Sequence, residues 1–197
     1  MNHLSGSAPL DDLPADRPVA VVTGANRGIG LEVVRQCAAH EMAVVLGCRD
    51  VAKGRSAAQR HGLQERVLVR ALDVTSQRDV DALAEELGRR FGRLDVLVNN
   101  AAIHYDTWQH GVSADLGVVT EALQTNLLGA WRTCIAFAGL LRRSRHARVV
   151  NVSSEAGSIS EMRGGAPAYS VSKAALKSCA TAVARSRKAV GCCCSSR

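Results

Sequence analysis

The stretch Thr23-Gly24-Ala25-Asn26-Arg27-Gly28-Ile29-Gly30 separates two segments with different hydrophobic patterns. The apolar run 19–22 precedes it and predicts a buried strand, whereas the residues that follow repeat their apolar positions at helical spacing. Glycines between a strand and a helix allow a tight turn and let the backbone approach a pyrophosphate, which the helix N-terminus attracts. The stretch therefore predicts a dinucleotide-binding turn, and the alternative is an ordinary glycine-containing turn between a strand and a helix.

The rest of the chain alternates between the same two patterns. Strands are expected at residues 18–23, 43–48, 66–71, 94–99 and 147–152. Helices are expected at residues 28–40, 51–61, 77–90, 115–143 and from residue 168 onward. Repeated strand–helix–strand units predict an α/β fold with a doubly wound parallel sheet of Rossmann type, whose ligand crevice lies at the carboxyl ends of the strands.

Length and composition favour one domain at residues 18–190, because 197 residues of which 47% are apolar can bury a sizeable core. Residues 1–17 lack the apolar core of a signal peptide and are expected to be a disordered leader. No stretch is long and apolar enough to span a membrane, so no membrane partner is expected. Cys37, Cys48 and Cys134 fall in expected core elements, which favours reduced thiols and a cytoplasmic location.

A second pattern lies near the other end of the chain, where Tyr169 and Lys173 are four residues apart. At that spacing both side chains lie on one face of a helix, about one turn apart. An ammonium group so close to a phenol favours the phenolate form. The pair therefore predicts a proton donor and acceptor that is usable near neutral pH.

Together these patterns resemble the short-chain dehydrogenase/reductase family, and the resemblance runs from about Val19 to about Ala184. The glycine-turn spacing is similar to that of the single-domain, carbonyl-reductase-like branch rather than that of the sugar epimerases. The matching motifs follow one another in order: the TGxxxGIG turn, Asp73-Val74, Asn99-Asn100-Ala101, Asn126, Ser154, and Tyr169 with Lys173.

The resemblance implies a catalytic role for four residues and a reaction in which a carbonyl compound is reduced. Tyr169 would protonate the carbonyl oxygen while hydride arrives from the cofactor, and Ser154 would hold that oxygen. Lys173 would favour the phenolate form of the tyrosine and hydrogen-bond the nicotinamide ribose. Asn126 would support a water relay to Lys173. Taken singly, Asn126 could instead cap or bridge a helix, and Ser154 could be a turn residue at a strand end.

The resemblance also implies the cofactor-binding residues: Gly24, Asn26, Arg27, Gly28, Ile29, Gly30, Arg49, Asp73, Val74, Asn100, Ala101, Tyr169 and Lys173. Cys48 stands where relatives that prefer NAD often carry an acid. Two guanidinium groups, those of Arg27 and Arg49, would bind the 2′-phosphate, so NADP(H) is favoured over NAD. Asp50 counts against this preference, and either arginine could be an ordinary surface residue.

The substrate is less well encoded. Residues 104–108, HYDTW, follow the fourth strand on the crevice side and would either line a pocket for an apolar carbonyl compound or form an ordinary packed loop. The segment 158–168 is short, so no large lid is expected there. The long helices near 115–143 and 168–187 would be the contact surface of a homo-oligomer.

The chain departs from the family pattern after about residue 178, where we expect the sixth and seventh strands to be missing or altered. Residues 1–161 carry 18 basic and 18 acidic residues, whereas residues 162–197 carry seven basic and no acidic ones. The positive net charge therefore belongs to this last part, and no nucleic acid partner is expected. Residues 191–197 would form a Cys-rich tail without metal-ligand spacing. The alternative function is that of a truncated, catalytically weak or inactive relative, which at most binds a nucleotide or a partner chain.

Overall fold

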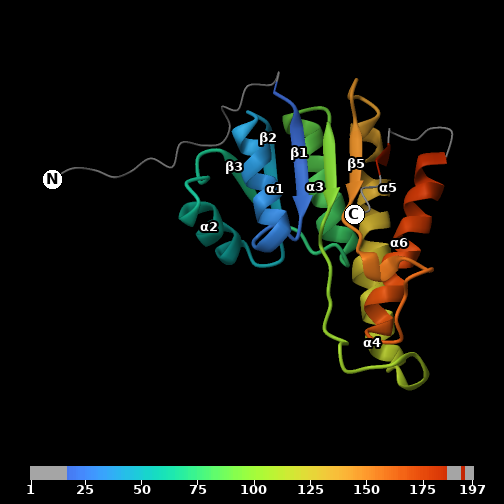
Figure 1. Cartoon of the computed structure of the whole chain (residues 1–197). Helices are drawn as coiled ribbons and strands as arrows, with labels where there is room; N and C mark the ends of the chain where they lie inside the picture. Colours follow the sequence, from blue (N-terminus) through green and yellow to red (C-terminus); the bar gives the residue numbers. More distant parts are fainter. Residues whose placement is uncertain (1–16, 186–191, 194–197) are drawn as a thin grey trace.

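A computed structural model describes residues 17–185 and 192–193, and it places a single parallel sheet at the centre of the protein. The strands follow one another in the spatial order β3-β2-β1-β4-β5-β6 (Figure 1). Their bounds are β1 Val19–Thr23, β2 Ala43–Cys48, β3 Val67–Ala71, β4 Val96–Asn99, β5 Arg148–Asn151 and β6 Cys192–Cys193. The order reverses between β1 and β4, which is where a doubly wound sheet opens its ligand crevice.

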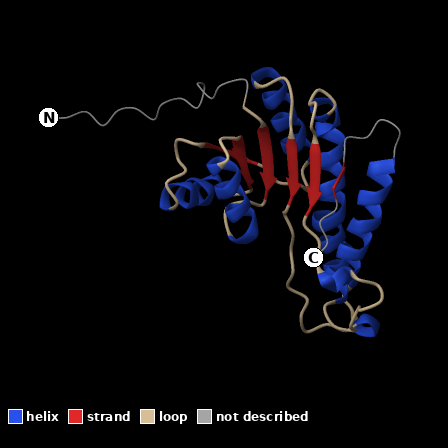
Figure 2. Cartoon of the chain, turned by 45° about the horizontal axis from the view of Figure 1, so that its top comes forward, coloured by secondary structure: helices blue, strands red, loops and turns tan. Residues whose placement is uncertain are grey.

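Helices cover both faces of the sheet (Figure 2). α1 and α2 pack on one face, α3 and α5 pack on the other, and α6 lies against α5 and β5. Their bounds are α1 Gly28–Ala39, α2 Val51–Arg60, α3 Gln77–Arg90, α4 Leu116–Ala122, α5 Ala130–Leu141 and α6 Pro167–Arg185, with short 3-10 turns η2 Gly111–Ser113 and η4 Glu155–Gly157.

The strand sequences explain why both faces are covered. Val19 and Val21 face the cluster that contains α3 and α5, whereas Ala20 and Val22 face the cluster that contains α1 and α2. A strand with apolar residues on both faces must be buried on both, as parallel strands in α/β proteins are. The largest fully buried side chain is Phe137 of α5.

The structure confirms the expected α/β class and the strand positions to within two residues at either end. The helix expected at 115–143 differs, because a π-helical segment, η3 Leu123–Gly129, separates α4 from α5. The last strand, β6, pairs only two residues with β5. These two residues were assigned to the tail, so part of that expected tail joins the sheet.

Residues 1–16 of the leader expected at 1–17, and the remainder of the tail, lie outside the described residues. Within the part of the chain that the structure describes, no helix combines the length and the apolar character needed to cross a membrane.

Candidate active site

A crevice with a volume of about 700 Å³ opens at the carboxyl ends of the central strands. It is lined by residues that follow β1, β2, β3 and β4, so the loops after four strands build it together. Ten of the residues expected to bind the cofactor line it: Gly24, Asn26, Arg27, Gly28, Ile29, Arg49, Asp73, Val74, Asn100 and Ala101. Gly30 lies beneath this crevice, and Tyr169 and Lys173 lie outside its lining.

The glycine turn is shaped by the chain that leaves β4. The side-chain amide of Asn100 donates to the carbonyls of Thr23 at 2.9 Å and Gly24 at 3.1 Å. A Cβ atom on Gly30 would lie 2.4 Å from that amide nitrogen, and a Cβ atom on Gly24 would lie 2.8 Å from Cα of Ala101. Gly28 differs, because its φ is +56° and a Cβ atom there would meet no atom within 4 Å. Two of the glycines therefore serve packing, and Gly28 faces open space.

Three cations surround the crevice, and one of them was not anticipated. Lys53 lines it together with Arg27 and Arg49. Lys53 lies in the first turn of α2, which begins two residues after Arg49, so both residues follow the carboxyl end of β2. The site can therefore attract an anionic group from three directions.

The carboxylate of Asp50 also lines this crevice, but it already has partners. It caps the N-terminus of α2 by accepting from the backbone N–H of Lys53 at 3.0 Å, and its second oxygen lies 3.4 Å from Nζ of the same residue. The backbone hydrogen bond from Lys53 holds the pKa of this carboxyl below its usual range. Asp50 is thus a helix cap paired with a cation. This pairing reduces the electrostatic repulsion between its carboxylate and a bound phosphate. Cys48 is buried and does not line the crevice.

The Tyr–Lys pair lies on α6, outside the lining of this crevice. Lys173 is only 2% exposed, and its Nζ atom donates to the carbonyl of Val152 at 2.7 Å. The same Nζ atom lies 5.7 Å from the centroid of the Tyr169 ring, as the helical spacing predicts. Burial lowers the pKa of Lys173 to about 8. The ammonium is therefore predominantly present at neutral pH, and it retains N–H groups beyond the one bound to Val152.

Ser154 lies at the turn between β5 and η4. Its hydroxyl caps η4 by accepting from the backbone N–H of Ala156 at 3.2 Å. η4 packs directly on α6, and Gly157 makes this approach feasible, because a Cβ atom there would lie 2.7 Å from the carbonyl carbon of Lys173. No sequence pattern predicts this role for Gly157. The contact brings the loop that carries Ser154 against the helix that carries Tyr169.

Asn126 lies on the π-helical segment and is 1% exposed. Its side-chain amide donates to the carbonyl of Ile103 at 3.0 Å and to the hydroxyl of Ser172 at 2.9 Å, while its oxygen accepts from the N–H of Ile103 at 2.8 Å. The side chain thus joins the loop after β4 to α6. π-helical turns of this kind are frequent at functional sites. A water relay from Asn126 to Lys173 stays a prediction.

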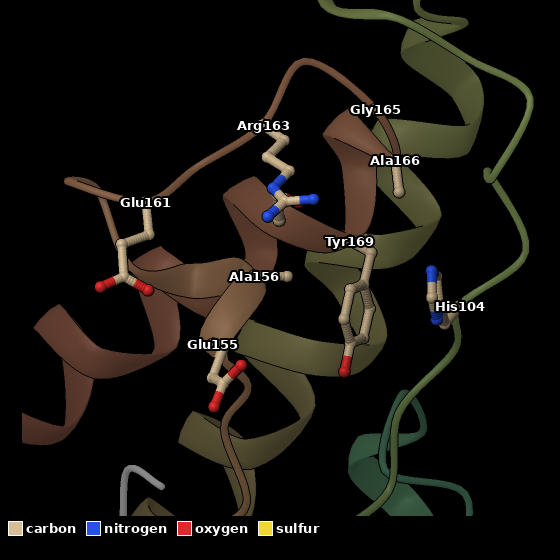
Figure 3. Close-up of a pocket in the computed structure, with 9 residues that line it drawn as sticks. His104, Glu155, Ala156, Glu161, Arg163, Gly165, Ala166 and Tyr169 are labelled. Atoms are coloured by element: carbon tan, nitrogen blue, oxygen red, sulfur yellow. The ribbon is translucent and has the colours of Figure 1, made fainter.

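A second cavity, with a volume of about 750 Å³, surrounds Tyr169. In Figure 3 the His104 ring lies beside the Tyr169 ring; the two centroids are 4.0 Å apart and the planes differ by 18°. The full lining consists of His104, Glu155, Ala156, Glu161, Arg163, Gly165, Ala166, Tyr169 and Ser170. This wall contains three charged side chains, and a pocket for an apolar compound stays one of the two alternatives that the sequence left open.

Two loops contribute to this cavity to different extents. Of residues 104–108 only His104 lines the cavity, since Tyr105 and Trp108 are 40% and 68% exposed and Asp106 is buried. The segment 158–168 contributes more than its length suggested, because Glu161, Arg163, Gly165 and Ala166 all line the cavity. An antiparallel bridge between His110 and Gly165 joins the two loops, and no sequence pattern predicts such a pairing.

The two cavities meet along one short segment. Ile103 lines the crevice of the glycine turn, and the next residue, His104, lines the cavity around Tyr169. This arrangement defines the class of protein: a doubly wound parallel α/β domain whose glycine-turn crevice lies next to a Tyr–Lys pair.

Comparison with known proteins agrees with that class. The profile of the short chain dehydrogenase family matches residues 18–192. The chain therefore belongs to the short chain dehydrogenase family.

The relatives include several reductases and dehydrogenases. The chain is 36% identical to (+)-neomenthol dehydrogenase of Arabidopsis thaliana over 161 residues, which cover 71% of this chain and 54% of the relative. It is 38% identical to carbonyl reductase [NADPH] 1 of Oryctolagus cuniculus over 149 residues, which cover 72% of this chain and 50% of the relative. The chain thus spans about half the length of these curated relatives.

A solved structure shows the same fold. The NADPH-bound carbonyl reductase from chicken fatty liver superposes with a TM-score of 0.81 at 28% identity, covering 90% of this chain and 77% of that one.

Proposed function

We propose that this chain is an NADPH-dependent oxidoreductase that transfers hydride to a carbonyl compound, a ketone or an aldehyde. The observation that carries the proposal is the junction at Ile103 and His104, where the crevice of the glycine turn meets the cavity of Tyr169. A dinucleotide in the crevice would direct its reactive end toward the tyrosine. The names of the relatives, which include two carbonyl reductases, support the reaction class.

In this proposal the bound cofactor supplies the hydride, and the protein supplies the proton. The Tyr169 hydroxyl donates to the carbonyl oxygen as negative charge develops there. The Lys173 ammonium, held by Val152, stabilises the phenolate that remains and contacts the cofactor ribose. The Ser154 hydroxyl, which accepts from Ala156, has its own proton free to donate to the same carbonyl oxygen. Asn126 would return protons to Lys173 through water.

The residues of the crevice fit NADP(H) better than NAD. Arg27 and Arg49 supply positive charge where the 2′-phosphate would lie, and the carboxylate of Asp50 caps α2 and pairs with Lys53. The open space at Gly28 leaves room for the pyrophosphate near the N-terminus of α1. The backbone and the charges together support the cofactor choice.

The wall around Tyr169 supports a substrate that carries polar groups. Glu155, Glu161 and Arg163 come from η4 and the segment after it, on the opposite side of Tyr169 from His104 (Figure 3). These three residues are exposed to solvent, so a polar or charged group of the substrate would be able to pair with them from within the cavity. We therefore propose that the carbonyl compound carries a polar group, whereas an apolar compound was one of the two alternatives left open by the sequence.

The Tyr169→Phe variant tests the proposal. It is expected to abolish reduction of a test ketone and to leave NADPH binding nearly unchanged, because only the proton donor is removed. Tyr105→Phe is a matched control, since the chain has two tyrosines and Tyr105 does not line either cavity. Reduction at more than a small fraction of the parent rate in Tyr169→Phe would refute the assignment. NADPH binding without turnover in the parent would favour the alternative of a nucleotide-binding relative.

We also propose a homo-oligomer in the cytoplasm. Leu128, Trp131 and Ile135 are exposed at helical spacing on η3 and α5, within the helices expected to form the contact. The thiols of Cys37 and Cys48 are consistent with a reducing compartment. Sedimentation of the parent and a Trp131→Glu variant at equal concentration would test the assembly.

A further inference from the structure

The loop that leaves β4 reaches across the site to the start of α6. Asp106 lies in this loop and is 2% exposed. Its Oδ2 atom accepts from the backbone N–H of Ala168 at 2.7 Å and from that of Tyr169 at 3.3 Å, so the contact joins residues 62 and 63 positions apart. A buried carboxylate in this position satisfies first-turn N–H groups and lies at the positive end of the helix dipole.

α6 depends on this contact because its own sequence offers no cap. The residues at its start are Gly164, Gly165, Ala166 and Pro167, and none of them carries a side-chain acceptor. The carbonyl of Ala166 accepts the first helical hydrogen bond, from Ser170 at 3.0 Å, so Ala166 occupies the cap position. Its φ of +48° is unfavourable for an L-residue other than glycine. The helix therefore begins at a strained residue and takes its capping group from another part of the chain.

The same loop also holds the ring of Tyr169. The backbone of Ile103 is fixed on both its N–H and its carbonyl by Asn126, and the next residue, His104, stacks on the tyrosine ring. Asp106 then binds the backbone of that tyrosine. Ring and backbone of one residue are thus held by the single segment 103–106.

We propose that Asp106 is a positioning residue that sets the direction of Tyr169 by capping α6 from outside the helix. Tyr169 is the third residue of α6, so loss of the cap frees the turn that aims its side chain. Lys173 lies one turn further and is held separately by Val152, so it stays in place. The inference rests on the proposed function for its consequence in turnover, but the geometry itself can be tested without turnover.

The test uses the fact that the chain has two tyrosines. In a Tyr105→Phe background, ring-labelled tyrosine gives NMR signals from Tyr169 alone, and His104 displaces them through its ring current. Asp106→Ala is expected to move these signals toward those of an unstructured tyrosine. Amide exchange of the peptide that contains Ala168 and Tyr169 should rise roughly tenfold, as loss of an N-cap predicts. Asp106→Asn keeps an acceptor oxygen and should stay within about threefold of the parent.

Asp115→Ala is the matched control, because the Asp115 carboxylate accepts from the N–H of Gly117 at 2.7 Å and caps α4, a neighbouring helix that packs on α6, rather than α6 itself. It should leave the Tyr169 signals unchanged. Unchanged signals in a folded Asp106→Ala variant, or equal shifts in Asp106→Ala and Asp106→Asn, would overturn the proposal. Should Asp106→Ala not fold, Asp106→Ser, whose hydroxyl is one bond shorter, gives the same comparison.

Turnover is the second readout. If the proposed function holds, Asp106→Ala lowers kcat about tenfold or more with an unchanged Kd for NADPH, and Asp106→Asn restores most of kcat. A fall in NADPH affinity equal to the fall in kcat would indicate general loosening and would count against positioning. An inactive parent would refute the proposed function while leaving the NMR and exchange results to decide the role of Asp106.

Discussion

The two cavities of this protein are built in different ways. The crevice of the glycine turn is shaped by residues next to the ends of neighbouring strands, as in the clamp that Asn100 places on Thr23 and Gly24. Each of these residues belongs to a short motif that directly follows a strand. The geometry of this half is therefore fixed by local sequence and by strand order.

The cavity around Tyr169 depends on contacts between segments that no motif connects. Asp106 binds the start of α6, Asn126 binds Ile103, and Gly157 lets η4 reach the backbone of Lys173. Charged residues of the segment 158–168 complete the wall. Because these contacts join separate loops, we expect a substitution at one of them to change the orientation of the side chains in the cavity before it changes the fold. The crevice should respond to substitution in stability and binding, and the Tyr169 cavity in turnover.

The largest expected effect is in the crevice. In Gly30→Ala the new Cβ atom would lie 2.4 Å from the amide nitrogen of Asn100 and 2.9 Å from Cα of Ala25. Backbone atoms cannot give way cheaply, so we expect a loss of about 3 kcal/mol or more in the free energy of unfolding, measured with urea. Gly139→Ala on α5 is the control, since its Cβ atom would meet nothing within 4 Å. Equal stability of Gly30→Ala and the parent would show that the side chain of Asn100 does not pack closely against Gly30.

The next effect concerns Lys173, one helical turn from Tyr169, and is a dependence of the free energy of unfolding on pH. Burial lowers the pKa of Lys173 from 10.5 to about 8. Below pH 8 the native and unfolded states both carry this proton, and burial of the charge costs stability in full. Between pH 8 and 10.5 the unfolded state keeps a proton that the native state has released, so stability rises with pH.

Relative to Lys173→Met, the free energy of unfolding of the parent should therefore increase across this range. Since each pKa unit corresponds to about 1.4 kcal/mol, the increase is on the order of 3 kcal/mol at most. Urea unfolding of both proteins at several pH values measures it, and the difference cancels the titration of other groups. Parallel stability curves would mean that Lys173 is not held in a desolvating site.

The sequence predicted the first half of the molecule well for a physical reason. Strand runs such as 19–22 and the turn that follows them depend on neighbours along the chain, and the parallel order then follows from repeated strand–helix–strand units. The spacing of Tyr169 and Lys173 was equally local, because it is a property of one helix.

The second half was predicted less well because its determinants are not periodic. Asp106 is one polar residue within the loop HYDTW, and only the structure shows that it faces α6 while Tyr105 is exposed. The π-helical segment was expected as ordinary helix, since its sequence continues the same apolar spacing. Gly157 carries no turn signal of its own, and its role appears only when η4 meets Lys173.

A smaller effect, on nucleotide binding, tests which residues of the crevice distinguish NADPH from NADH. Arg27→Ala and Arg49→Ala should each weaken NADPH by roughly 1.5–3 kcal/mol, which is about 10- to 100-fold, and change NADH binding little. Titration calorimetry with both nucleotides measures the difference. Arg35→Ala is a matched control, because that side chain pairs with Glu32 at 2.7 Å on α1 and does not line the crevice. Equal losses for the two nucleotides would remove these arginines from the 2′-phosphate site.

The smallest expected effect on stability comes from Gly28, whose role in the turn differs from that of Gly30. Gly28 has a φ of +56° and open space where a Cβ atom would lie, so Gly28→Ala costs only the strain of a left-handed residue, about 1 kcal/mol. The same methyl group would project into the crevice that Gly28 lines, so NADPH affinity should fall more than stability does. Urea unfolding and titration calorimetry on one preparation give both values. The contrary outcome is a Gly28→Ala variant that loses as much stability as Gly30→Ala and keeps its affinity for NADPH. That result would show that Gly28, like Gly30, is required for packing of the turn and not for room for the ligand.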